Sequence, residues 1–117
     1  METKETKIVR INTIEINGHL GQTPELRELN NDKCVTKFSI AQHTFVNGEK
    51  FTHWFNIVIW NEKARTACEK LSKGDFASFR GRLSTREYKN NDGQKRVTYE
   101  IVADEFSLET NLQRKAS

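Results

Sequence analysis

The chain is short, polar and close to neutral. Its 117 residues fit a single domain, because domains cluster around ~100–150 residues, and 19 basic against 16 acidic residues give a net charge of only +3. A mean hydropathy of -0.76 argues against membrane-spanning helices, and Glu2, Lys4 and Glu5 leave no apolar signal-peptide core at the start. Two cysteines are too few for a disulfide framework, and the hydrophobic content of 35% permits a core only if it is strictly patterned.

Apolar and polar residues alternate through the first half of the chain, which predicts strands. The first strand is expected over Asn12–Leu20 and the second over Cys34–Phe45. Asn47 and Gly48 follow as a hairpin turn, because this dipeptide tolerates the positive φ angles that tight hairpins need. The third strand, Phe51–Trp60, is rich in aromatic and β-branched residues.

One helix is predicted after the third strand. Asn61 is its expected N-cap and Gly74 its expected C-terminal stop. The stripe at helical spacing between them comprises Ala64, Ala67, Cys68 and Leu71. We therefore expect one short helix whose apolar stripe faces the strands.

Two more strands complete the pattern, at Asp75–Lys89 and Gln94–Phe106, with a turn at residues 91–93 between them. Five strands with a single helix between the third and the fourth is the order of an OB-fold barrel. Closing a small sheet on itself buries one face of every strand with few side chains, which suits a chain with only 35% hydrophobic residues. We expect an all-β, five-stranded OB-fold domain over residues 1–109 and a short disordered tail over residues 110–117.

Basic and aromatic side chains gather on one face of three neighbouring strands. In the third strand Phe55, Ile57 and Ile59 form the core row, which leaves Trp54 and Trp60 on the opposite row. In the fourth strand Ala77, Phe79 and Leu83 form the core row with Gly81. The outward row of the second strand is Lys37, Ser39, Ala41, His43 and Phe45. The outward row of the fourth strand is Ser78, Arg80, Arg82, Ser84, Arg86 and Tyr88.

Positive charge is concentrated over residues 80–96. This segment holds six basic and two acidic residues, a balance of +4 against +3 for the whole chain. Basic groups neutralise phosphates, and aromatic rings stack on the bases that single strands expose, at ~1–3 kcal/mol per base. The pattern predicts a binding face for single-stranded nucleic acid. Its candidate residues are Trp54, Trp60, Tyr88, Phe45, Lys37, Arg80, Arg82, Arg86, Lys89, Lys95 and Arg96.

Each of these residue types also has an interpretation without nucleic acid. Exposed arginines on a strand commonly form a solvated face or guard against edge pairing. Trp54 and Trp60 would alternatively pack against a second subunit, Tyr88 would be an ordinary cross-strand residue, and Phe45 would brace the hairpin turn. Their coincidence on adjacent strands favours nucleic-acid binding.

Several short motifs occur in a fixed order. They are Asn17–Gln22 with Pro24–Arg27, Phe38–Ala41, Trp54–Phe55 with Ile57–Trp60, Lys63–Ala64 through Leu71–Gly74, Gly81–Arg86, Tyr88 and Asp92–Gln94. Over about Asn12–Phe106 this set resembles the bacterial single-stranded DNA-binding protein family. The resemblance implies an OB-fold that binds single-stranded DNA with little sequence preference, as a homotetramer or a dimer, in replication, recombination and repair. It also implies a cytoplasmic location at the bacterial nucleoid.

The resemblance also assigns roles to single residues. It implies that bases stack on Trp54, Trp60 and Tyr88, more loosely on Phe45, and that Arg82 and Arg86 lie along the DNA path. Glu62 and Glu87 depart from the pattern, since many relatives carry a basic residue there. The basic end Asn111–Ser117 also departs from it, because the family usually ends in an acidic tip that recruits replication and repair enzymes. We therefore expect a truncated chain or a tailless plasmid, phage or transposon copy, without that recruitment.

Two other classes of function fit less well. An enzyme is not expected, nor any metal or cofactor, because the three histidines lack metal-ligand spacing and no phosphate loop or nucleophile elbow occurs. Cys68 on the helix stripe is interpreted as a small core residue. An OB-fold interaction module resembling primosomal replication protein N would share the fold, but it has no need of the aromatic set.

Overall fold

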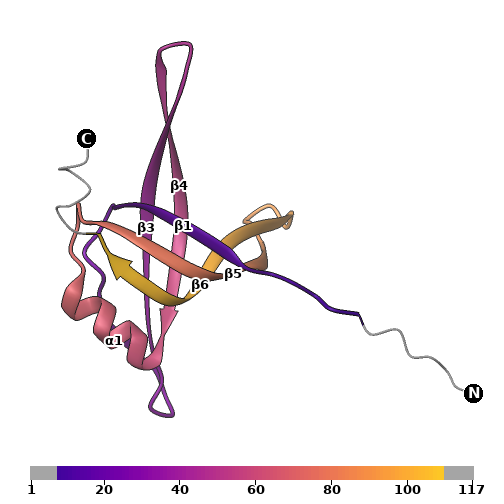
Figure 1. The fold of residues 1–117 in the computed structure, drawn as a ribbon. Helices are drawn as coiled ribbons and strands as arrows, with labels where there is room; N and C mark the ends of the chain where they lie inside the picture. Colours follow the sequence, from indigo (N-terminus) through magenta and orange to yellow (C-terminus); the bar gives the residue numbers. More distant parts are fainter. Residues whose placement is uncertain (1–7, 110–117) are drawn as a thin grey trace, which may run out of the picture.

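A closed β-barrel forms the body of the computed structural model, which describes residues 8–109, and one helix lies at an end of the barrel (Figure 1). The elements are β1 (Ile14–Leu20), β2 (Arg27–Glu28), β3 (Cys34–Val46), β4 (Glu49–Trp60), α1 (Asn61–Lys70), β5 (Phe76–Lys89) and β6 (Lys95–Leu108). Apart from the two-residue β2, these are the five strands and the helix that the sequence predicts. The expected tail, residues 110–117, lies outside the described residues.

Strand pairing closes the barrel. The order is β1-β5-β6-β4-β3-β2, and β1 also pairs with β3 where Leu20 lies opposite Ile40. Among the described strands β4 and β6 run parallel, with Ile57 opposite Ile101, and the other pairs are antiparallel. This topology, with the helix between β4 and β5, confirms the OB-fold prediction.

The inner rows of the strands form the core that the alternation predicts. Ile40, Ile57 and Phe79 are at most 1% exposed, and the rings of Phe38 and Phe79 lie 5.5 Å apart. Leu83 belongs to the same row as Phe79 but is 41% exposed, so its expected place in the core is wrong. The ladder between β1 and β5 ends at Gly81. At Leu83, β5 therefore pairs with β6 but no longer with β1, which leaves the side chain exposed.

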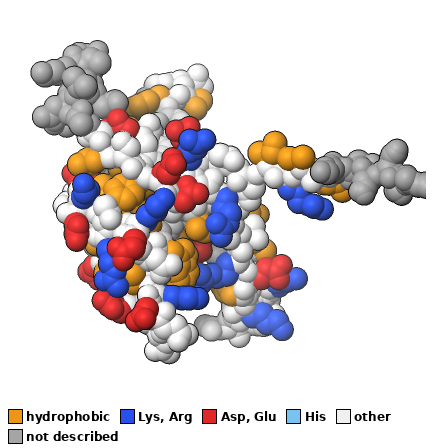
Figure 2. All heavy atoms as spheres, turned by 60° about the horizontal axis from the view of Figure 1, so that its bottom comes forward, with side chains coloured by type: hydrophobic (Ala, Val, Ile, Leu, Met, Phe, Trp, Pro, Cys, Tyr) orange, Lys and Arg blue, Asp and Glu red, His pale blue; other side chains and the backbone are white. Residues whose placement is uncertain are grey.

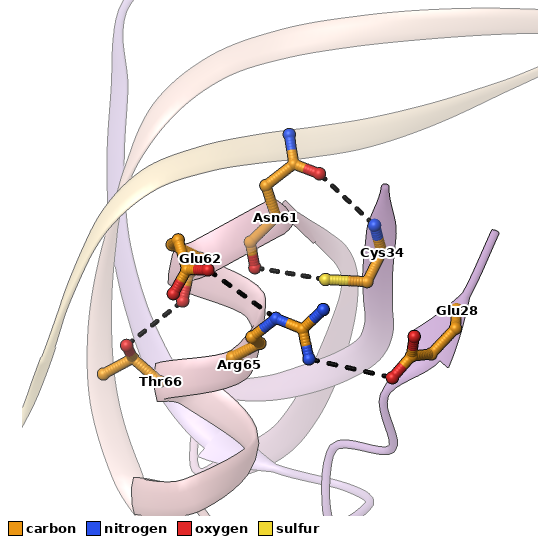
Figure 3. Close-up of polar contacts among 6 residues, drawn as sticks. All are labelled: Glu28, Cys34, Asn61, Glu62, Arg65 and Thr66. Carbon is orange, nitrogen blue, oxygen red and sulfur yellow. Dashed lines mark hydrogen bonds and ion pairs between the residues drawn. The ribbon is translucent and has the colours of Figure 1, made fainter. Parts of the chain in front are cut away.

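The start of the helix differs from the prediction (Figure 3). Asn61 is not the N-cap, because Trp60 occupies that position and no side chain caps the helix there. Instead, the Asn61 Oδ1 accepts a hydrogen bond from the Cys34 backbone N–H at 3.2 Å, and the Asn61 carbonyl oxygen lies 3.4 Å from the Cys34 thiol. Its φ of 57° is one that asparagine tolerates better than most residues. The side chain therefore joins the helix to β3.

The end of the helix differs as well. The helix stops at Lys70, with Leu71 as an extended C-cap, so Gly74 is not the stopping residue. Gly74 lies instead in a turn closed by a hydrogen bond from the Asp75 N–H to the Ser72 carbonyl oxygen at 3.0 Å. Its φ of 91° explains why glycine occupies that turn. No helix of the part described is long and apolar enough to cross a membrane.

Two long hairpins extend beyond the barrel (Figure 1). The β3–β4 hairpin keeps its register from Val35 opposite Trp60 to Val46 opposite Glu49, and it turns at Asn47 and Gly48. The positive φ angles of these two turn residues, 51° and 81°, confirm the predicted tight turn. The β5–β6 hairpin begins at a register shift between Arg80 and Gly81. A β-carbon on Gly81 would lie 1.9 Å from the Val102 carbonyl oxygen, so glycine alone fits at this close approach.

Candidate nucleic-acid interface

The strand registers bring the outward rows of four strands together. Lys37 on β3 lies opposite Val58 on β4, and Val58 lies opposite Val102 on β6. Val102 in turn lies opposite Arg82 on β5. Because directly opposed residues share a face of the sheet, these four side chains form one line across the barrel. We call the surface around this line the outer face; its further members on the same rows are Ser39, Ala41, Trp54, Asn56, Trp60, Ser84, Arg86, Tyr88, Arg96, Thr98 and Glu100.

Aromatic rings flank this line with much of their surface exposed. Trp54 is 59% exposed, Trp60 42% and Tyr88 51%, and Phe45, farther out on the β3 row, is 68% exposed. Trp54 and Trp60 lie six residues apart on β4, which at ~3.3 Å per residue is roughly 20 Å. An exposed ring has a free π face, so these side chains are able to stack on planar ligands.

A groove of about 300 Å³ lies between the two tryptophans. It is lined by Gln22, Lys37, Phe38, Ser39, Asn56, Ile57, Val58 and Glu100. Val58 is only 3% exposed although it lies on the outward row, so it forms part of the floor of the groove. The sequence reasoning missed Glu100, yet the alternation along β6 places it on the row of Thr98 and Val102.

The predicted basic residues have different surroundings. Arg86 forms an ion pair with Glu100 at 3.5 Å, Arg80 with Glu105 at 3.8 Å, and Lys95 with Glu87 at 3.4 Å. Figure 2 shows one face of the molecule, on which basic and acidic side chains are intermixed. Within residues 8–109, Lys37, Arg82 and Lys89 have no ion-pair partner, and Arg96 donates to the Gln94 amide oxygen at 3.0 Å.

The structure does not bring all the predicted residues onto the outer face. Lys89 lies opposite Lys95, on the row of Glu87, which is the reverse side of the β5–β6 hairpin from Tyr88. Two exposed residues that the sequence reasoning missed, Val97 and Tyr99, lie on the same reverse row, at 47% and 58% exposure.

Two further predicted residues, Arg80 and Phe45, continue the outward rows beyond the outer face. Arg80 shares the row of Arg82 but lies between Glu15 on β1 and Glu105 on β6, so its charge is balanced locally. Phe45 continues the row of Lys37 and Ala41 out along the β3–β4 hairpin.

The histidines of the β3–β4 hairpin are each bound to a threonine of the opposite strand. His43 Nδ1 lies 2.9 Å from Thr52 Oγ1, and His53 Nε2 lies 2.9 Å from Thr44 Oγ1. The two histidines belong to opposite rows of the hairpin, so they do not form a pair. Both contacts brace the hairpin across its strands.

The sequence of the chain, outer face included, is similar to those of known proteins. A family model described as the Single-strand binding protein family matches residues 11–109. Single-stranded DNA-binding protein 1 of Lactococcus lactis is 37% identical over 105 residues, which cover 86% of this chain and 70% of that protein. Single-stranded DNA-binding protein 2 of Staphylococcus aureus is 39% identical over 97 residues, covering 80% of this chain and 69% of that protein.

A third relative, the single-stranded DNA-binding protein of Neisseria meningitidis, is 34% identical over 103 residues, and these cover 84% of this chain but 59% of the relative. This chain thus spans less than the full length of all three relatives. The family model covers every strand of the barrel, the helix and both hairpins. The chain therefore belongs to the single-strand binding protein family.

Proposed function

We propose that this protein binds and protects single-stranded DNA with little sequence preference and without catalysis, in bacterial replication, recombination and repair. The observation that carries the proposal is the outer face, where Lys37 and Arg82 have no ion-pair partner within residues 8–109 and lie between exposed aromatic rings. The names of the bacterial relatives agree with it.

The two kinds of side chain act on different parts of the ligand. Lys37, Arg82 and Arg96 neutralise phosphates, and each contact releases a condensed counterion, whereas Arg86 exchanges its ion pair with Glu100 for a phosphate. Trp54, Trp60 and Tyr88, with Phe45 farther out, stack on bases. Because every base has a π face, stacking discriminates little between sequences, whereas a duplex keeps those faces covered.

The remaining predicted residues lie beside this path. Arg80 is balanced by Glu105, and Lys89 and Lys95 lie on the reverse row of the β5–β6 hairpin. A strand reaches Lys89 and Lys95 only by passing over the edge of that hairpin. We assign these three residues a secondary contribution, which acts mainly through the general positive potential.

We further propose a homotetramer, or a dimer as its building block, located at the nucleoid in the cytoplasm. Ile8, Val9 and Ile11 precede β1 and are 68%, 77% and 83% exposed. β1 pairs with β5 over Ile14–His19 but with β3 only at His19 and Leu20, so one edge of β1 is largely unpaired among the described residues. A second copy would cover both features. Light scattering of the purified chain measures the oligomer, and a monomer at micromolar concentration would contradict this assembly.

Tryptophan fluorescence titrated with oligo-dT at several salt concentrations tests DNA binding. We expect quenching, because Trp54 and Trp60 are the two tryptophans of the chain and both lie on the outer face. We also expect log K to fall linearly with log salt, by about 0.7 for each phosphate neutralised. Unchanged fluorescence with no binding by a second method, or an affinity indifferent to salt, would contradict the proposal.

A further inference from the structure

The position of the Trp54 ring depends on a glycine from another strand. A β-carbon placed on Gly21, which follows β1, would lie 2.8 Å from Cζ3 and 3.3 Å from Cη2 of the Trp54 indole. Carbon atoms in contact prefer separations of about 3.5–4.0 Å. The six-membered ring of the indole therefore lies directly over the Gly21 backbone, in space that any other residue would fill.

Small residues continue this contact beneath the ring. Ala41 on β3 lies directly opposite Trp54 and is only 6% exposed, although it belongs to an outward row. A β-carbon on Gly21 would also lie 3.1 Å from Ser39 Oγ. Trp54 itself keeps 59% of its surface exposed. Gly21, Ser39 and Ala41 thus form a platform on which the indole rests with its other face open.

Hydrogen bonds hold the platform from both sides. The Gly21 N–H donates to the Ser39 carbonyl oxygen at 2.9 Å, and the Ser39 N–H donates to the Gln22 amide oxygen at 2.9 Å. On the other side, the Leu20 N–H donates to the Asp75 carbonyl oxygen, also at 2.9 Å. Since the backbone of Gly21 is held in place, a larger residue there would displace the indole.

The backbone angle of Gly21 does not explain the glycine. Among the described glycines, positive φ angles occur at Gly48, Gly74 and Gly93 but not at Gly21. Gly18 and Gly81 differ in another way, because added β-carbons there would meet backbone atoms of β3 and β6. Gly21 is the glycine whose missing side chain makes room for a ring of the outer face.

We infer that Gly21 is a positioning residue for Trp54, which sets the indole in a stacking position before a base arrives. This inference rests on the proposed function only for its effect on DNA. Holding the ring in advance removes the ordering cost that a free side chain would incur on binding. A residue with a β-carbon at position 21 should therefore weaken stacking without changing any charge.

The test uses Gly21→Ala and two Trp54 backgrounds. Losing one stacked base costs ~1–3 kcal/mol, which is about 5- to 150-fold in affinity. We expect Gly21→Ala to weaken oligo-dT binding by at least about 5-fold, within the loss caused by Trp54→Ala, with an unchanged salt slope. In the Trp54→Phe background, which lacks the indole benzo ring that the new β-carbon would meet, we expect Gly21→Ala to change affinity less than about 2-fold. An equal loss in both backgrounds, or no loss in either, would overturn the inference.

A measurement without DNA separates this inference from the proposed function. Trp60→Phe leaves Trp54 as the one tryptophan of the chain. In that background Gly21→Ala should shift the emission maximum to longer wavelength and increase quenching by acrylamide; identical spectra would contradict the inference even if DNA binds. If Gly21→Ala unfolds the protein by circular dichroism, Trp54→Phe should restore folding, and a double variant that stays unfolded would overturn the inference too.

Discussion

The two hairpins that leave the barrel differ in chemistry. Residues 41–54, which we call the aromatic arm, contain two charged residues, Glu49 and Lys50, and expose Phe45, Val46, Phe51 and Trp54. Residues 82–102, the charged arm, contain eight charged residues. The aromatic arm is braced by histidine–threonine contacts, and the charged arm by ion pairs such as Arg86–Glu100.

This difference separates the two interactions proposed for single-stranded DNA, stacking of its bases on aromatic rings and contacts of its phosphates with basic groups. Each arm has a side chain of the outer face at its base, Trp54 on the aromatic arm and Arg82 on the charged arm. Stacking on rings is only weakly affected by salt, whereas phosphate contacts weaken as the salt concentration rises. The comparison therefore predicts that variants of the aromatic arm change affinity at constant salt slope, whereas variants of the charged arm change the slope.

The largest effect is expected where the charged arm joins the barrel. Gly81→Ala places a β-carbon 1.9 Å from the Val102 carbonyl oxygen, so the β5–β6 ladder must separate there. We expect a loss of roughly 3 kcal/mol or more in the free energy of unfolding, measured by urea denaturation. Gly93→Ala at the tip of the same arm is the control. It meets no atom within 4 Å and strains only the φ of 78°, at a cost of about 1–2 kcal/mol.

The second effect concerns the base of the aromatic arm. Trp54→Ala should weaken oligo-dT binding by ~1–3 kcal/mol, because it removes one stacking ring, and it should leave the salt slope unchanged. Fluorescence of the remaining Trp60 and a competition assay measure it. Wild-type affinity with an unaltered oligomer would assign Trp54 to packing and remove the aromatic arm from the DNA path.

Much of this arrangement could be predicted from alternation alone. The inner row of Phe38, Ile57 and Phe79 follows from period two, because a side chain's face is fixed by its position in the strand. The outward position of Trp54 and Arg82 follows from the same rule.

What could not be predicted depends on partners distant in sequence. Asparagine is a residue type preferred at helix N-caps. The side chain of Asn61 nevertheless binds the backbone of Cys34, which only the folded barrel brings near. Arg80 belongs to the predicted row, yet Glu15 and Glu105 lie beside it through two different ladders. The contact of Gly21 with Trp54 spans three strands and leaves no local pattern.

A third prediction tests the base of the charged arm. Arg82 has no ion-pair partner within residues 8–109, so Arg82→Gln removes a charge that is free to meet a phosphate. We expect about 1 kcal/mol weaker binding at low salt and a salt slope reduced by about 0.7. Lys70→Gln, on the helix, loses the same charge away from the outer face and serves as the control. Equal slopes for the two variants would mean that Arg82 acts only through net charge.

The smallest effect is expected on the reverse side of the charged arm. Glu87 pairs with Lys95 at 3.4 Å, and both side chains are more than half exposed, so Glu87→Gln should change the free energy of unfolding by less than about 1 kcal/mol. Oligo-dT binding should nevertheless strengthen slightly at low salt, because the substitution removes a negative charge from an arm rich in positive ones. The gain should disappear at high salt, where screening shortens the reach of every exposed charge. A gain that persists at high salt would mean that Lys95 contacts the DNA directly, and the reverse side of the charged arm would then be part of the binding path.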